Sequence, residues 1–354
     1  MDYIIPSLAL KTFIETPQIL KKAIAANKVI AELKGVAKTI PNQAIILTML
    51  ALQESKDSSA IENIVTTYDE LFKYDEQAQN FPPATKEIYR CNDALFHGFK
   101  ALKARPLSNN LLIELAQIIT DRRSGFRDLP GTVLKNGQGA LVYTPPQNFA
   151  EIVEQMKDLE RFINDRELSD LDPLVKMAII HHQFESIHPF FDGNGRTGRI
   201  LNILYLISEG LLDVPILYLS RYITEHKSEY YQLLQKVREK EAWEEWILYM
   251  LSALEITAKQ TIMTIESINA MMMEYKTIIR GAEPKLYSHE LMNTIFSHPY
   301  TKIEFLSSNI KVSRLTASKY LKKLVAMGLL ELKKHGNTNY YINTKLVALF
   351  IGLK

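Results

Sequence analysis

Residues 188–199 read HPFFDGNGRTGR, and this stretch decides which fold and which chemistry the rest of the chain supports. Gly193 and Gly195 flank Asn194, so the backbone can turn successive N–H groups into one concavity that binds anions. The segment that follows, residues 196–208, is rich in helix formers, and the positive end of its dipole would face the same concavity. The stretch therefore predicts a phosphate-binding turn at the start of a helix.

Charged side chains accompany the predicted turn. Asp192 is a natural ligand for the Mg²⁺ that accompanies nucleotides. Arg196 and Arg199 lie in the first turns of the predicted helix, where a cation is unfavourable unless an anion or a carboxylate offsets it. His188 precedes Pro189, where the preceding helix must end, and an imidazole with a pKa near neutrality could take a proton from an attacking hydroxyl. A lone histidine is usually structural and a lone GxG is usually a turn, but their combination within twelve residues favours phosphate chemistry.

The stretch resembles the signature of the Fic family, written HPFx(D/E)GNGRxxR, and every defined position matches. The resemblance covers roughly residues 58–254 and implies a mainly α-helical Fic core. It also implies a nucleotidyltransferase that moves AMP from ATP, with Mg²⁺, onto a Tyr, Thr or Ser hydroxyl of a protein, which includes modification of itself. In that reaction the hydroxyl attacks the α-phosphate and pyrophosphate leaves.

The resemblance assigns a role to each matching residue of the signature. The roles are His188 as the base, Asp192 as the Mg²⁺ ligand, the backbone of Gly193, Asn194 and Gly195 as the phosphate cradle, Arg196 as the contact to the distal phosphates, and Arg199 as a second nucleotide contact. For the nucleotide base, Tyr230 and Tyr231 are two candidates for stacking, and the sequence does not choose between them.

Residues 132–143, TVLKNGQGALVY, interrupt the helical pattern of the chain. Two short β-like runs flank Asn136-Gly137, a dipeptide that favours a tight hairpin turn. The hairpin resembles the flap of the Fic family over residues 132–144. By that resemblance Leu141, Val142 and Tyr143 would hold the target segment through backbone pairing, as an unpaired strand edge can.

Residues 58–63 read SSAIEN and resemble the inhibitory motif (S/T)xxxE(G/N), which matches at Ser58, Glu62 and Asn63. In that family the glutamate reaches the second arginine of the signature, here Arg199, and blocks the placing of the ATP γ-phosphate. The plain alternative is that Ser58 caps a helix and Glu62 lies on its solvent face. A further alternative is that Glu62 orients a water that removes AMP from a modified target, and the sequence does not decide the direction.

A long apolar stripe follows the signature, with residues at three- and four-residue steps: Leu251, Leu254, Ala258, Thr261, Ile265, Ile268 and Met272. This spacing predicts a long helix packed on its own chain, with a homodimer seam as the alternative. Gly281 and Pro284 predict its end. We therefore expect an N-terminal helical region over 1–100, the Fic core over 101–280 and a separate domain over 285–354.

Residues 285–354 are basic, with 11 Lys+Arg against 3 Asp+Glu (+8), whereas the remainder has 31 against 37 (−6) and the whole chain carries +2. Helices are expected at 302–308 and 313–327, followed by β-like runs at 329–334 and 339–342. This order resembles a small winged helix-turn-helix (α+β) domain. DNA phosphates would then meet Arg314, Lys319 and Lys323 on the second helix and Lys333 and Lys334 on the wing.

The basic domain leaves two partner classes open, because many winged helices bind proteins instead of DNA. It also supports a rival function for the chain, a DNA-binding transcriptional regulator whose Fic body serves as a sensing or interaction domain. The complete signature argues against this rival, since a non-catalytic body would need neither His188 nor Asp192.

From the composition and the N-terminal residues we expect a globular protein of the cytoplasm. No apolar run approaches the ~20 residues that a membrane-spanning helix needs, so we expect no membrane segment. The N-terminus carries Asp2 and Pro6 without a basic flank and an apolar stretch, so we expect no secretory signal. Cys91 is the single cysteine, which excludes an intramolecular disulfide framework and a multi-cysteine metal site.

Overall fold

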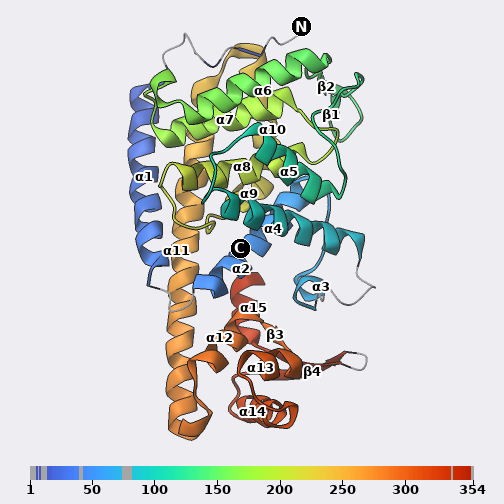
Figure 1. The fold of residues 1–354 in the computed structure, drawn as a ribbon. Helices are drawn as coiled ribbons and strands as arrows, with labels where there is room; N and C mark the ends of the chain where they lie inside the picture. The colour runs from blue at the N-terminus through green and yellow to red at the C-terminus, as the bar shows by residue number, and fades with distance from the viewer. Residues whose placement is uncertain are drawn as a thin grey trace. The chain divides into compact units, whose positions relative to one another are not determined.

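The computed structural model describes residues 5–6, 8, 14–39, 43–73, 82–335 and 338–351, with the side chains of 43–46 left out. The chain is mainly α-helical with two small antiparallel sheets, which confirms the expected fold class (Figure 1). It divides into a first unit of residues 1–35, 50–65 and 86–259 and a second unit of residues 36–49, 66–85 and 260–354.

The elements up to residue 282 are mostly helices. They are α1 (Pro17–Ala37), α2 (Gln43–Ile61), α3 (Tyr68–Lys73), α4 (Pro83–Ala101), α5 (Asn109–Thr120), β1 (Leu134–Lys135), β2 (Leu141–Tyr143), α6 (Phe149–Asn164), the 3-10 helix η1 (Arg166–Leu168), α7 (Pro173–Ile187), α8 (Asn194–Ser208), α9 (Leu219–Glu225), α10 (Lys227–Lys240) and α11 (Trp243–Ala282). Within the described residues none of the helices is both long and apolar enough to cross a membrane.

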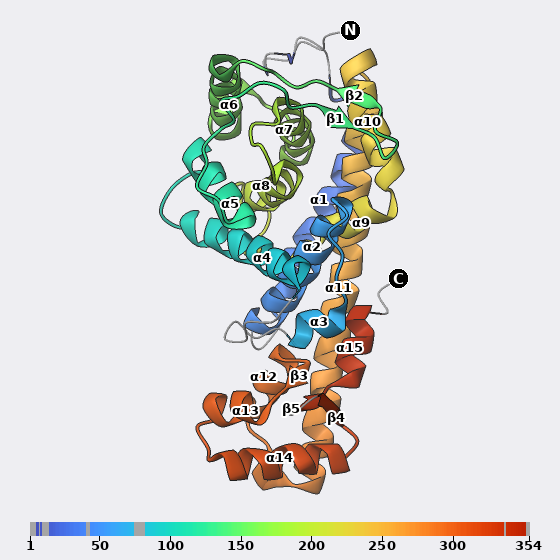
Figure 2. The same cartoon turned by 90° about the vertical axis from the view of Figure 1, so that its right-hand side faces the viewer.

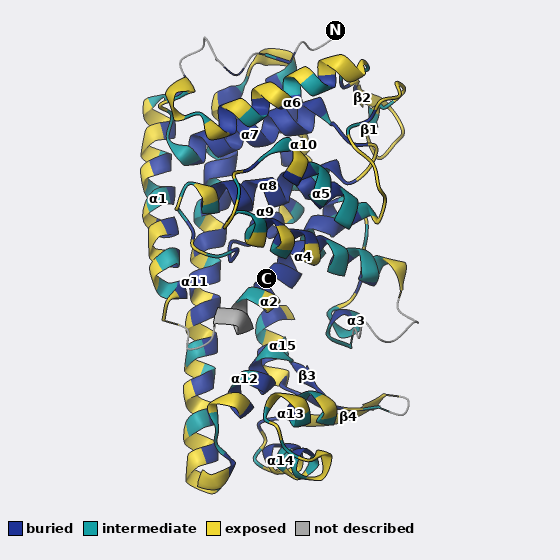
Figure 3. Cartoon of the chain, in the orientation of Figure 1, coloured by how far each residue is buried: buried dark blue, intermediate teal, exposed yellow. Residues whose placement is uncertain are grey.

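Helix α7 is the centre of the first unit, because every residue from 174 to 187 is buried (Figure 3). Its start is defined by Asp172, whose carboxylate accepts a hydrogen bond from Leu174 N at 2.8 Å, and by Pro173 at the first helical position. Helix α8 packs on α7 and on α5, and α6 packs on α7 from another side (Figure 2). The loop of residues 188–193 therefore joins two helices that packing holds in place.

Strands β1 and β2 form the expected hairpin. Asn136 N donates to Ala140 O at 2.9 Å, and the Asn136 side-chain oxygen accepts from Gln138 N and Ala140 N. Gly139 has φ 81°, a left-handed conformation that glycine adopts without steric cost. Gly139 N also donates to Asn136 O at 2.9 Å, so Gly137 lies inside a four-residue turn at the place where the sequence predicted it.

Helix α11 has the expected stripe and the expected end. All seven residues from Leu251 to Met272 in the predicted stripe are buried, and the helix ends at Ala282. Residues up to 259 belong to the first unit and those from 260 to the second. In the second unit Tyr275 of α11 is buried and donates to Leu329 O at 3.0 Å and to Asn343 Oδ1 at 2.9 Å. The packing of this unit thus begins ahead of residue 285.

The rest of the second unit contains short helices around a three-stranded sheet. The elements after α11 are the 3-10 helix η2 (Pro284–Leu286), α12 (His289–Ser297), β3 (Tyr300–Thr301), α13 (Ile303–Asn309), α14 (Arg314–Ala326), β4 (Glu331–His335), β5 (Thr338–Ile342) and α15 (Thr344–Ile351), with the strands in the order β3-β5-β4. The predicted pair of helices and the hairpin after them are present as α13, α14, β4 and β5. Helices α12 and α15 and strand β3 were not predicted, since their short runs lack a distinct periodicity.

Candidate functional site

His188 ends helix α7 in the left-handed conformation, with φ 48° and ψ 59°. Its side chain is half-buried. Burial first, and then the guanidinium groups of Arg127 and Arg238, lower the pKa of His188 to about 3, although the backbone carbonyl of Glu185 acts in the opposite direction. The expectation of a pKa near neutrality is therefore wrong for this state. The imidazole is neutral at physiological pH and has a lone pair that can accept a proton.

Asn194 closes the loop between α7 and α8. Its side-chain oxygen accepts from Phe190 N at 2.8 Å and its side-chain nitrogen donates to Phe190 O at 2.7 Å. The Asn194 side chain is therefore used by the loop, and only its backbone is left to a phosphate. Gly193 has φ 79°, and a Cβ there would lie 3.2 Å from the side chain of Thr120. Both features agree with a compact turn at the start of α8.

Asp192 lies beside this turn and stays open to solvent. Its Oδ1 accepts from Gly193 N at 2.7 Å, and its side chain is 56% exposed. Within the described part of the chain no group of three or more His, Cys, Asp and Glu side chains is arranged to hold a metal. Mg²⁺ commonly binds one or two carboxylates together with phosphate oxygens and water, so a single exposed carboxylate beside a phosphate cradle fits this ion.

Arg196 is 1% exposed and contacts three carboxylates. Its Nε donates to Glu62 Oε2 at 2.8 Å, its Nη1 pairs with Glu87, and its Nη2 lies 3.3 Å from Asp192 Oδ1. Although burial opposes the charge, these carboxylates raise the pKa of Arg196 above its usual value. The unfavourable position near a helix start is thus offset by anions, as the sequence required.

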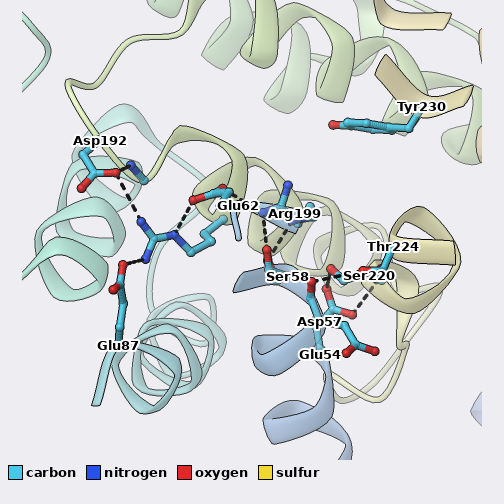
Figure 4. Close-up of polar contacts among 12 residues, drawn as sticks. Glu54, Asp57, Ser58, Glu62, Glu87, Asp192, Arg199, Ser220, Thr224 and Tyr230 are labelled. Carbon is cyan, nitrogen blue, oxygen red and sulfur yellow. Dashed lines mark hydrogen bonds and ion pairs between the residues drawn. The ribbon is translucent and has the colours of Figure 1, made fainter. Parts of the chain in front are cut away.

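Arg199, one turn further on, is 2% exposed and reaches the end of α2 (Figure 4). Its Nε donates to Ser58 Oγ at 2.8 Å, and its Nη2 donates to Ser58 O at 2.8 Å and to Glu62 Oε1 at 2.9 Å. Ser58 lies in the last turn of α2 and is 1% exposed. The interpretation of Ser58 as a helix cap with Glu62 on a solvent face is therefore wrong.

Glu62 bridges Arg196 and Arg199, of which the family resemblance implied the contact to Arg199. A Cβ at Gly195 would lie 2.5 Å from Glu62 Oε1 and 2.9 Å from Arg199 Nη1, so the glycine lets the carboxylate approach. Asn63 follows with φ 65°, a conformation that Gly and Asn adopt more easily than other residues, and this explains the last position of the motif. Both arginines are occupied while Glu62 is in place.

Sequence reasoning missed a second set of buried and partly buried polar groups around the end of α2 (Figure 4). Glu54 accepts from Ser220 N at 2.9 Å and from the Ser220 hydroxyl, and burial raises the pKa of Glu54 to about 7. Asp57 accepts from the Tyr218 hydroxyl, and its backbone carbonyl accepts from Thr224 Oγ1 at 3.2 Å. Glu54 and Asp57 precede Ser58 on the same helix, but no local spacing indicated that they would face α9.

The two tyrosines proposed for base stacking lie in different environments. Tyr230 is 1% exposed and its hydroxyl is 2.8 Å from His181 Nε2, so it belongs to the core, and the stacking prediction is wrong for this residue. Tyr231 is 48% exposed and remains a candidate. In the flap, Leu141 and Val142 are 63% and 39% exposed. Tyr143 instead points inward, where its hydroxyl donates to Ser186 O at 2.9 Å.

Three family models match the chain. The model described as "Fic/DOC family N-terminal" matches residues 20–100, "Fic/DOC family" matches 106–206, and "Protein adenylyltransferase SoFic-like, C-terminal domain" matches 271–346. Together they include the signature and most of the chain on either side of it.

Relatives share modest identity with this chain. The "Protein adenylyltransferase fic-1" of Caenorhabditis briggsae is 30% identical over 139 residues, which are 39% of this chain and 25% of that protein. The C. elegans protein of the same name is 37% identical over 83 residues, 23% of this chain and 15% of that one. A "Probable protein adenylyltransferase" of Aquifex aeolicus is 27% identical over 186 residues, 50% of this chain and 54% of that one. The chain thus spans about half or less of each relative.

Solved structures share the fold at low identity. A Fic family protein from Desulfovibrio desulfuricans superposes with a TM-score of 0.59 and 18% identity, over 93% of this chain and 97% of that chain. Fic-1 of C. elegans gives a TM-score of 0.54 and 19% identity, over 70% of this chain and 73% of that chain. These likenesses show a shared architecture.

Proposed function

Because this chain belongs to the Fic/DOC family, we propose that it is a protein adenylyltransferase that transfers AMP from ATP to a Tyr, Thr or Ser hydroxyl of a protein. The observation that carries the proposal is the loop between α7 and α8. It places a neutral imidazole at His188, an exposed carboxylate at Asp192 and a glycine-rich turn at 193–195 within a few residues. General base, metal ligand and phosphate cradle are the groups that nucleotidyl transfer needs.

In the proposed reaction His188 takes the proton of the target hydroxyl as its oxygen attacks the α-phosphate. A P–O bond forms to the target, the bond to the β-phosphate oxygen breaks, and pyrophosphate leaves. The backbone of residues 193–195 holds phosphate oxygens, and Asp192 holds the Mg²⁺ that neutralises charge on them. Most of the acceleration then comes from positioning and electrostatics.

We propose that Glu62 inhibits this reaction in the resting state. Its two carboxylate oxygens occupy Arg196 and Arg199, two cations in the first turns of the helix that follows the expected phosphate cradle. Charge-assisted pairs of this kind compete directly with phosphate for the same donors. Transfer would require Glu62 to leave at least one guanidinium.

The flap would hold the target through its backbone and its exposed apolar side chains. Leu141 and Val142 face solvent and can contact a target segment, while Tyr143 anchors the strand to α7 through Ser186. A strand edge of this kind accepts an extended peptide by β-pairing. The target, which includes a second molecule of this chain, would present its hydroxyl toward His188.

The test is labelling of proteins by isotope-labelled ATP. We expect Glu62→Gly to label more strongly than the natural chain, and His188→Ala in the Glu62→Gly background to lose ~10²- to 10⁴-fold, the usual cost of a lost general base. Other nucleotides supplied in parallel test the preference for ATP. Wild-type labelling by the His188→Ala double variant would refute the assigned base. If Glu62→Gly instead removes AMP more slowly from a modified target, Glu62 acts in AMP removal.

A second function rests on a separate observation, the basic surface of the second unit. Arg314, Lys319, Lys322 and Lys323 on α14 and Lys333 and Lys334 on β4 are all exposed. We propose that this surface binds DNA in the manner of a winged helix.

Fluorescence anisotropy of a labelled mixed-sequence duplex at about 50 and about 200 mM salt tests this proposal. DNA affinity should fall steeply with salt, and Lys319→Glu should reduce the slope of that dependence by about one. The matched control is Lys157→Glu, an exposed lysine of the first unit. Absence of binding at low salt would assign the surface to a protein partner.

A further inference from the structure

Arg127 lies in the connection between α5 and the flap and is fully buried, with 0% exposure. Its guanidinium is directed at the backbone around His188. The Nε donates to His188 O at 2.8 Å, and the Nη2 donates to Ile187 O at 3.4 Å and to Pro146 O, where the flap ends. Its own backbone N–H donates to Pro189 O at 2.8 Å. One residue thus contacts three consecutive carbonyl groups, with His188 in the middle.

The backbone that Arg127 holds is not a relaxed one. His188 has φ 48°, a left-handed conformation that residues with a Cβ rarely adopt and that persists only when the surroundings hold it. A planar guanidinium with several fixed donors can bond diverging acceptors at the same time, which a lysine ammonium at the end of a flexible chain does less well. Nη1 has no hydrogen-bond partner among the described residues, so burial of this cation is costly and calls for a functional reason.

We propose that Arg127 is a positioning residue for adenylyl transfer, one that fixes the backbone of His188 so that its imidazole meets the target hydroxyl held by the flap. The inference rests on the proposed function. Arg127 touches neither ATP nor the target in this arrangement. It acts through His188 and through Pro146, and so links the end of the flap to the base.

The charge of Arg127 affects a second measurable quantity, the pKa of His188. Two cations act on the imidazole, Arg127 from the connection before the flap and Arg238 from α10, and the backbone carbonyl of Glu185 in α7 opposes them. Arg238 is held by Ser186 Oγ at 3.1 Å and by the ring of Tyr143. Loss of the Arg127 charge should therefore raise the pKa of His188, whereas loss of its geometry alone should not.

Two variants separate geometry from charge, each made in the Glu62→Gly background so that transfer can be measured. Arg127→Lys keeps the charge and loses the planar set of donors, while Arg127→Gln loses both. Arg123→Gln, an exposed arginine of the same connection, is the matched control. For each we measure the melting temperature, the KM for ATP, kcat, and the pH profile of kcat/KM.

We expect Arg127→Lys to lower kcat by about 10²-fold, the usual cost of a misplaced catalytic group, with little change in the KM for ATP. The acid limb of its pH profile of kcat/KM should stay at the same pH. Arg127→Gln should also shift the acid limb to higher pH. Normal kcat in Arg127→Lys, or an unshifted acid limb in a folded Arg127→Gln, would overturn the proposal. If Arg127→Gln does not fold, kcat of Arg127→Lys still decides. Failure of Glu62→Gly itself to label would instead refute the proposed function.

Discussion

Arginine side chains occupy opposite environments in the two units. Arg196 and Arg199 in the first unit are 1% and 2% exposed and share a carboxylate. Arg314 in the second unit is 72% exposed, and its partner Glu304 is 51% exposed. A buried guanidinium that loses its carboxylate leaves a positive charge without a counter-charge, whereas the charge of an exposed guanidinium is solvated by water and screened by salt. The carboxylates therefore hold the buried arginines of the first unit in one geometry. The exposed arginine of the second unit remains accessible to a binding partner.

Among the substitutions that test this difference, removal of Glu62 should change the stability of the protein most. Loss of one partner from a buried ion pair usually lowers the free energy of unfolding by roughly 3 to 5 kcal/mol. Arg196 keeps its ion pairs with Glu87 and Asp192, whereas Arg199 keeps its hydrogen bonds to Ser58 but loses its ion pair among the described residues. Mg-ATP offers both arginines phosphate oxygens, so thermal melting of Glu62→Gly should show a larger ligand-induced rise than the natural chain. Equal rises in the two proteins would mean that Glu62 does not compete with phosphate.

Acid should weaken the first unit through two histidines whose pKa is lowered in the folded state. Burial lowers the pKa of His181 and of His188 to about 3, against 6.5 in the unfolded chain. The unfolded state therefore binds more protons between pH 6.5 and about 3, and stability is lost as the pH falls through this window, by up to ~1.4 kcal/mol per pKa unit and group.

Two buried carboxyl groups act in the opposite sense. Burial raises the pKa of Glu54 and of Glu185 to about 7, so their contribution is present below pH 4.5 and is lost as the pH rises to about 7. The opposed effects should nearly cancel between pH 4.5 and 6.5, and below pH 4.5 stability should fall. Urea unfolding from pH 3.5 to 7.5 measures this dependence. Glu54→Gln should remove one carboxyl contribution, so that the free energy of unfolding of the variant rises with pH between 4.5 and 6.5, and a natural chain that grows more stable below pH 4.5 would contradict the assignment.

The smallest effect is expected at the exposed pair of the second unit. Glu304→Gln breaks the contact with Arg314, and because both side chains are mostly in solvent the free energy of unfolding should change by less than ~1 kcal/mol. Chemical denaturation at low and high salt provides the measurement. A loss as large as that of Glu62→Gly would mean that exposure does not distinguish the two units as we describe.

The main features of the fold could be predicted because they depend on short-range patterns. Periodic apolar residues located α11, and the helix-forming run after Gly195 located α8. Short elements with little periodicity, such as α12 and β3, could not be found in this way. The hairpin was found from its local dipeptide, but the left-handed conformation of Gly139 and the hydrogen bond from Ala140 N to the Asn136 side chain were not predicted.

What the sequence by itself determined is the set of chemical groups: an imidazole, a carboxylate and a glycine-rich turn within twelve residues, with two arginines in need of anions. Only the tertiary structure decided which anions and supports those groups receive. Arg196 meets Glu62 and Glu87 across separations of 134 and 109 residues, and Arg127 meets His188 across 61. The physical reason is that helix and turn preferences act over a few residues, whereas partners this distant along the chain are brought together only by packing of the helices that carry them.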